Sequence, residues 1–208
     1  MIDNLVVLSR LAIETRGHHV EADADLERLL SSLATGQDYR RFLSRLYGFL
    51  VPLEVALDAT PNLACAIDLR PRHKAYRLRS DLMALGVRIE QIANLPLCRG
   101  IPHAFRAPAP ALGWMYVIER STLLHTAVYR QLARSLPGEI AFASSYLKCY
   151  EGTVSSMWRG FGEALDVACG SSAAEAVSAA QEAFRCLRNW GANAGRSGRW
   201  TIQVSRSR

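Results

Sequence analysis

The chain has 208 residues, of which 50% are hydrophobic and 21% are charged, a composition typical of one globular domain with a single sizeable core. It contains no run of about 18 uncharged apolar residues, which argues against a membrane-spanning helix. The first ten residues, MIDNLVVLSR, lack the basic head and long apolar stretch of a signal peptide. We therefore expect a cytoplasmic protein with no membrane partner.

The net charge of +6 is spread along the chain instead of forming a basic block, so we expect no nucleic-acid partner. One basic segment, residues 196–208, is interpreted as a flexible C-terminal tail that follows a helical domain over residues 1–195. The five cysteines form no CxxC pair and indicate neither a zinc cluster nor a disulfide framework. We expect all five to be small buried hydrophobes: Cys65, Cys98, Cys149, Cys169 and Cys186.

An amphipathic helix is predicted over residues 3–22. Its inward stripe, at steps of three and four residues, consists of Leu5, Leu8, Leu11, Ala12, Thr15 and His19. Two histidines, His18 and His19, stand side by side near its end. His19 continues the stripe and is expected to face the core, whereas His18 lies about 100° away around the helix.

The middle of the chain predicts two more helices and a loop. Thr35 and Asp38 resemble a capping box at the start of a helix over residues 36–57, which Pro52 should kink. A shorter helix over residues 71–86 ends at Gly86. A loop is then indicated by three prolines: Pro102, Pro108 and Pro110.

The second half of the chain predicts three further helices. A long, mostly apolar helix covers residues 111–136 and is ended by Pro137-Gly138, and two others cover residues 157–170 and 172–190. No segment alternates apolar and polar residues over enough length to predict a strand, and no internal repeat is visible. The fold class predicted is therefore all-α, a single-domain helical bundle.

The usual catalytic motifs of helical and mixed enzymes are absent from the sequence. There is no pair of Glu-x-x-His motifs, no HExxH, no GxSxG and no glycine-rich phosphate loop. His19 is then the strongest candidate, because a neutral imidazole that faces the interior can ligate a heme iron if another helix covers the other face. The alternative, an ordinary core or surface histidine, stays open on residues alone.

Four stretches, taken in order, carry a resemblance that runs from about Leu5 to Trp190. They are LAIETRGHHVEAD, LGWMYVIERSTLLHTAVYR, YEGTVSSMWRGFGEAL and AAQEAFRCLRNW. Together they resemble the bacterial heme oxygenase family, including the members that serve bacteriophytochromes. In that family a His four residues after a Thr on the first helix is the proximal heme ligand, which here corresponds to His19. The second stretch resembles the distal helix, typically LGxLYVxEGSTLGG.

The resemblance implies a heme oxygenase-like fold and a biliverdin-producing activity. Heme would lie between the first and the distal helix as both substrate and cofactor, and an external donor, a ferredoxin or a reductase, would supply electrons. The products would be biliverdin, carbon monoxide and iron, and a bacteriophytochrome is the partner that would receive the biliverdin. The resemblance points to His19 as the iron ligand and to other heme-binding candidates: Arg16, Tyr116, Arg120, Leu124 and Arg159. Ser121 and His125 are the catalytic candidates on the distal side.

The distal helix departs from the family pattern at three positions. Arg120, Leu124 and His125 replace glycines, which adds bulk where the family keeps none and narrows the pocket. His125 either faces the iron, giving a bis-histidine site with His19, or fills space. Ser121 either orders a water or bonds back to its own helix.

A second departure lies on the first helix. Ala12 stands where relatives often carry a basic residue that reaches a heme propionate, and Arg10, Arg16 or Arg159 are candidates to replace it. Arg159 can equally be an exposed helix arginine, and Tyr116 can equally be a core aromatic.

Three functions remain open on the sequence. The first is an active heme oxygenase, supported by His19 and the order of the motifs. The second is a catalytically impaired relative that acts as a heme-binding or protein-interaction module, supported by Arg120, Leu124 and His125. The third is an enzyme of the same superfold with a different small substrate, because a fold does not fix a function.

Overall fold

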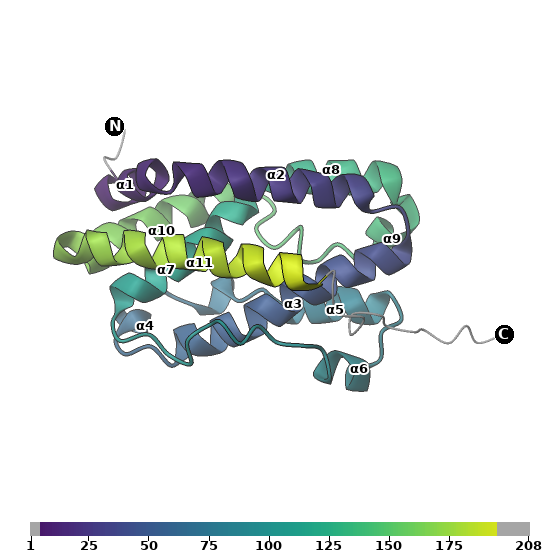
Figure 1. Cartoon of the computed structure of the whole chain (residues 1–208), viewed down its shortest axis with the longest axis horizontal. Helices are drawn as coiled ribbons and strands as arrows, with labels where there is room; N and C mark the ends of the chain where they lie inside the picture. Colours follow the sequence, from purple (N-terminus) through teal and green to yellow (C-terminus); the bar gives the residue numbers. More distant parts are fainter. Residues whose placement is uncertain (1–4, 195–208) are drawn as a thin grey trace.

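The computed structural model describes residues 5–194, and over this range every regular element is helical (Figure 1). The all-α prediction is confirmed. The α-helices are α1 (Val6–Glu14), α2 (Arg16–Ser32), α3 (Gly36–Asp58), α4 (Leu63–Ala66), α5 (Ala75–Ala84), α6 (Ile89–Ala93), α7 (Pro108–Ser121), α8 (His125–Ser135), α9 (Pro137–Phe142), α10 (Val154–Cys169) and α11 (Ala173–Ala194). Three short 3₁₀ turns are η1 (Arg70–Arg72), η2 (Thr122–Leu124) and η3 (Gly170–Ser172). The predicted basic tail, residues 196–208, lies outside the described residues.

Among residues 5–194, no helix combines the length and the apolar character that crossing a bilayer requires.

The single first helix that the sequence predicts is in fact two. A break at Thr15, where φ is −105° and ψ is 10°, separates α1 from α2, and α2 then continues as far as Ser32. Leu8, Leu11 and Thr15 are buried as predicted, but Ala12 is exposed. The break turns α2 relative to α1, so one stripe does not extend through both helices.

Helix α3 begins where the sequence predicts and ends one residue later, at Asp58, whereas α5 begins at Ala75, four residues after the predicted start, because Arg70–Arg72 form the 3₁₀ turn η1. Thr35 and Asp38 form a complete capping box at the start of α3, which continues without interruption through Pro52. Gly86 follows α5 with a φ of 83°, a left-handed conformation that favours glycine. The prediction of a C-terminal stop at Gly86 is confirmed.

The loop predicted around the three prolines is shorter than expected. Pro108 is the first residue of α7 and Pro110 lies in its first turn, where a missing backbone N–H costs no helical hydrogen bond. The long helix predicted to follow is interrupted as well, because α7 stops at Ser121 and α8 begins at His125. Pro137 likewise begins α9.

The core is built around the packing of α7 on α11 (Figure 1). A Cβ added at Gly113 of α7 would lie 2.2 Å from the backbone oxygen of Ala176 and 2.9 Å from the Cβ of Ala179. The glycine therefore lets the two helices approach closely, which fixes the position of α7.

Helix α2 is attached to this core more loosely. It lies beside α8 at the top of Figure 1, and Leu30 is its only buried residue. Partly exposed ion pairs join it to α11, where Arg188 contacts both Glu21 and Asp25. Such pairs are worth little individually, so α2 is held mainly by its partly buried apolar side chains, Ala22, Leu26 and Leu29.

The cysteines follow the prediction only in part. Cys98 and Cys169 are buried, Cys149 and Cys186 are partly buried, and Cys65 is exposed. Cys65 lies on the short helix α4, outside the apolar stripes that the prediction used.

Candidate functional site

His19 lies on α2, partly buried, and faces α7. Its Nε2 is 2.8 Å from the hydroxyl oxygen of Thr15 and 3.0 Å from that of Tyr116 on α7. Its ring also packs against Phe184 of α11, with ring centroids 5.3 Å apart. The predicted inward orientation therefore brings His19 to α7. His18 stacks on the same Phe184 at 5.8 Å, so it packs against the bundle too.

The imidazole of His19 is neutral at neutral pH. Burial lowers its pKa from 6.5 to about 4, and the nearby positive charge of Arg120 contributes in the same direction. A neutral ring offers a nitrogen lone pair to a metal. Because the Thr15 hydroxyl already donates to the carbonyl of Leu11, it can only accept from Nε2–H. Ligation through Nε2 therefore requires this contact to break.

An ion pair closes the space between α2 and α7 one turn beyond His19. Arg120 donates to both carboxylate oxygens of Asp23, at 2.9 and 2.7 Å. The side-chain hydrogen bond from Arg120 is the main cause of the lowered pKa of Asp23. We call this pair, together with the contact between His19 and Tyr116, the α2–α7 latch. The sequence did not point to Asp23, because its partner Arg120 lies 97 positions away.

The helical course of the chain changes between α7 and α8. Between α7 and α8 the chain makes the 3₁₀ turn η2, where Ser121 donates to the carbonyl of Ile118 at 2.7 Å and Thr122 to that of Glu119 at 2.6 Å. Hydroxyls that bond back to the preceding turn commonly bend helices. The back-bonded alternative for Ser121 is therefore what the structure shows.

A cavity of about 140 Å³ lies beside the latch, between α2, α3, α7 and α8. Ser121, Leu124 and His125 line it together with Arg120 and Phe184. An adjoining open groove of about 350 Å³ shares Ala22, Leu26, Phe42, Leu46 and Leu187 with it. Pockets for drug-sized ligands occupy roughly 300–1,000 Å³, so the cavity alone is small but continues into a larger opening.

His125 is buried at the start of α8. Its ring lies 4.7 Å from that of Tyr146, and its Nδ1 is 3.6 Å from the sulfur of Cys149. Burial lowers its pKa to about 3, so it too is neutral. Its packing against Tyr146 fits the space-filling alternative, although the residue also lines the cavity.

Two of the arginines proposed from the resemblance lie elsewhere. Arg16 and Arg159 are exposed and line neither the cavity nor the groove, and Arg10 bonds to Glu14 on the outer face of α1. Tyr116 and Arg120, in contrast, lie between α2 and α7, where Tyr116 contacts His19 and Arg120 pairs with Asp23, and Leu124 lines the cavity with Arg120.

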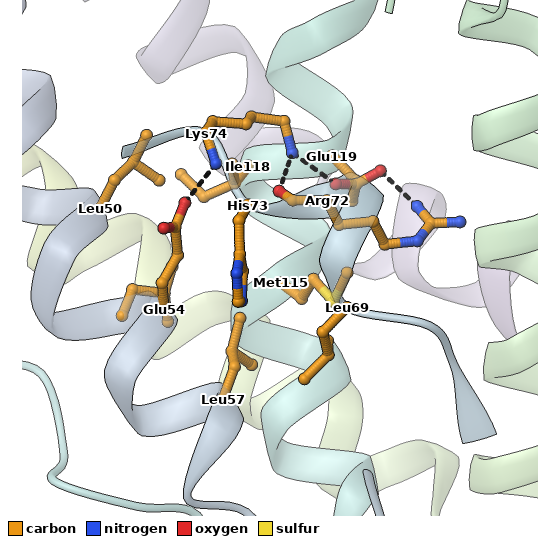
Figure 2. Close-up of a pocket in the computed structure, with 11 residues that line it drawn as sticks. Leu50, Glu54, Leu57, Leu69, Arg72, His73, Lys74, Met115, Ile118 and Glu119 are labelled. Atoms are coloured by element: carbon orange, nitrogen blue, oxygen red, sulfur yellow. Dashed lines mark hydrogen bonds and ion pairs between the residues drawn. The ribbon is translucent and has the colours of Figure 1, made fainter. Parts of the chain in front are cut away.

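A second polar cluster lies around Glu119 of α7, near the loop before α5 (Figure 2). Glu119 accepts from Arg72 at 2.6 Å, from Lys74 at 2.7 Å and from the hydroxyl of Tyr150 at 2.9 Å. The backbone N–H of Lys74 is bound by Glu54, whose pKa burial raises. Every group is paired and the enclosed space is about 20 Å³, so we assign this cluster a structural role.

Within residues 5–194 no three His, Cys, Asp or Glu side chains are grouped as a metal site would require. The inward-facing His19 of this all-helical bundle is a candidate single ligand. The chain matches the family model described as Heme oxygenase over residues 6–192, and it therefore belongs to the heme oxygenase family. No curated protein matches it. Family membership supports heme as the ligand and heme degradation as the general function.

Proposed function

We propose that this protein binds heme between α2 and α7 through His19 and cleaves it oxidatively to biliverdin, carbon monoxide and iron. One observation carries the proposal: a neutral histidine on the proximal helix of a heme oxygenase-family bundle faces the bent distal helix, beside a cavity that opens into a groove. Bound heme, with electrons from an external donor, would supply the oxidative chemistry. The chain's own task is to hold and orient the ring.

Heme binding requires the α2–α7 latch to open. A metal–imidazole bond is about 2 Å long, and the Tyr116 hydroxyl lies 3.0 Å from Nε2, in the space a porphyrin would take. The ring therefore enters only when His19 leaves Tyr116 and Asp23 leaves Arg120. Helix α2 can make this movement because it contributes one buried residue.

The residues around the slot then have separate tasks. His19 would hold the iron, Phe184 would support the imidazole, and Tyr116 would be freed to donate a hydrogen bond into the slot. Arg120, released from Asp23, is a cation placed to meet a heme carboxylate. Leu124 keeps the cavity side apolar and limits how much water enters.

A second candidate is a heme-binding protein that does not turn heme over. It is favoured by Arg120 and Leu124, which occupy positions where the resemblance expects glycine and which line the cavity. The structure offers no specific observation in favour of a different small substrate.

The finer features remain part of the proposal. They are the biliverdin product, the bacteriophytochrome-associated subtype, a ferredoxin or reductase as electron donor, a bacteriophytochrome as the acceptor of biliverdin, and a cytoplasmic location. They rest on the sequence resemblance.

The test is an absorbance titration with hemin, followed by reductant and air. We expect a Soret band at one equivalent, its loss or shift in His19→Ala, and a band close to wild type in the matched control His18→Ala. Reductant and air should then produce a bile-pigment spectrum. A Soret band that persists without turnover selects the second candidate. An unchanged band in His19→Ala rejects His19 as the ligand.

A further inference from the structure

Two cysteines far apart in the sequence meet on the side of the bundle near α6. Cys98 lies in the segment between α6 and α7, Cys186 lies on α11, and their sulfur atoms are 3.6 Å apart. A disulfide bond is about 2.05 Å long, so the two sulfurs are within one small side-chain adjustment of bonding distance.

The backbone holds this pair in place. The N–H of Cys98 donates to the carbonyl of Gly48 on α3 at 2.8 Å, which anchors the segment to the bundle. A Cβ at Gly100 would lie 3.0 Å from the sulfur of Cys186, so the glycine lets the segment pass close to α11. The approach of the two thiols is therefore a fixed feature of the packing.

The surroundings favour a thiolate on Cys98. A hydrogen bond from Cys186 is the main cause that lowers the pKa of Cys98, and the backbone N–H groups of Gly100 and Ile101 act in the same direction. The same bond raises the pKa of Cys186, which makes Cys186 the proton donor of the pair.

The pair is reachable from solvent. Both cysteines line an open hollow of about 450 Å³, whose charged groups are Arg99, Arg185 and Glu182. Two cations and one carboxylate leave this hollow electropositive, a setting typical of reactive cysteines.

We propose that Cys98 and Cys186 form a redox-active dithiol that hydrogen peroxide oxidises to a disulfide. The Cys98 thiolate attacks the peroxide, so that an S–O bond forms, the O–O bond breaks and the released hydroxide takes a proton to become water. The sulfur of Cys186 then attacks the sulfenic acid, forming the S–S bond and releasing a second water. Two thiols lose two electrons and two protons, and the peroxide gains them.

The experiment uses the purified full chain, reduced and then treated with hydrogen peroxide. We expect the intact mass to fall by two hydrogen atoms and peptide mapping to find Cys98 joined to Cys186, both reversed by dithiothreitol. In Cys186→Ser, dimedone should label Cys98, because no resolving thiol remains. Cys65→Ser is the matched control and should leave the disulfide yield unchanged.

Three outcomes would overturn the proposal: no mass loss in the wild-type chain, a disulfide that joins two chains through the exposed Cys65, or dimedone labelling that falls on Cys65 and spares Cys98. None of these readouts depends on heme, so their failure is separate from that of the proposed function.

Discussion

Two neighbouring residues of α7 are joined to the rest of the bundle in different ways. Glu119, 1% exposed, binds two buried cations, Arg72 and Lys74. Arg120 and Asp23, whose side chains are 18% and 43% exposed, connect α7 to α2. Breaking a buried pair costs far more than breaking an exposed one. The buried cluster around Glu119 therefore fixes the position of α7, whereas the pair of Arg120 with Asp23 can separate at much lower cost.

The largest effect on the free energy of unfolding is expected at the buried cluster around Glu119. Glu119→Gln leaves Lys74 and Arg72 buried without their carboxylate and should lower the free energy of unfolding by about 3–5 kcal/mol. Urea unfolding measures this. Asp68→Asn, which removes an exposed pair with Arg70, is the control and should leave the free energy of unfolding almost unchanged. Equal losses of unfolding free energy in the two variants would contradict the contrast between buried and exposed ion pairs.

Gly113→Ala tests the close approach of α7 and α11. The added methyl group meets the backbone of Ala176, so the helices must separate, and we expect a loss of about 1–3 kcal/mol. Gly17→Ala on α2 is the matched control, because nothing lies within 4 Å of the added Cβ, and it should stabilise the protein slightly. Thermal unfolding of both variants checks this. A neutral Gly113→Ala would mean that α7 is not held as closely as described.

Acidification should weaken the fold through the two neutral histidines. The folded-state pKa values of about 4 for His19 and about 3 for His125 lie below the ordinary value of 6.5. The unfolded chain therefore binds more protons than the folded one as pH falls from 6.5 to 4, and stability falls with it. Allowing for solvent screening of the partly exposed His19, we expect its share to be about 1–2 kcal/mol. Urea unfolding at a series of pH values should show a shallower decline in His19→Gln.

The smallest effect on the free energy of unfolding is expected at the pair of Arg120 with Asp23. Asp23→Asn weakens the latch and should change the free energy of unfolding by less than about 1 kcal/mol. If the latch holds the slot closed, the variant should bind hemin about threefold more tightly, because a larger fraction of the chain is open. Glu14→Gln, which removes a surface pair with Arg10, is the control for hemin titration. Weaker hemin binding by Asp23→Asn would show that Asp23 supports the site instead of closing it.

Local patterns in the sequence predicted much of this fold. Apolar periodicity located the long helices, and the capping box at Thr35 and the stop at Gly86 fixed ends of α3 and α5. The breaks at Thr15 and between Ser121 and His125 were missed, because periodicity shows which face is apolar and does not register a local change of backbone angles.

The candidate site was predicted less completely. The inward direction of His19 followed from helical spacing, but its contact with Tyr116 and the pair of Asp23 with Arg120 each join residues 97 positions apart. The two thiols of Cys98 and Cys186 are 88 positions apart. Pairings over such separations depend on how the helices pack, and no short motif encodes them.

The bend at η2 has a consequence for the unfolded ensemble. Leu124 and His125 have φ values of −92° and −55°, so the turn requires no glycine at either position. Replacing a glycine by a larger residue where φ is negative reduces the conformational freedom of the unfolded chain. This stabilises the native state by about 0.4–1 kcal/mol. The side chains of Leu124 and His125 therefore restrict the conformations of the unfolded chain, and glycine at either position would make the native state less stable.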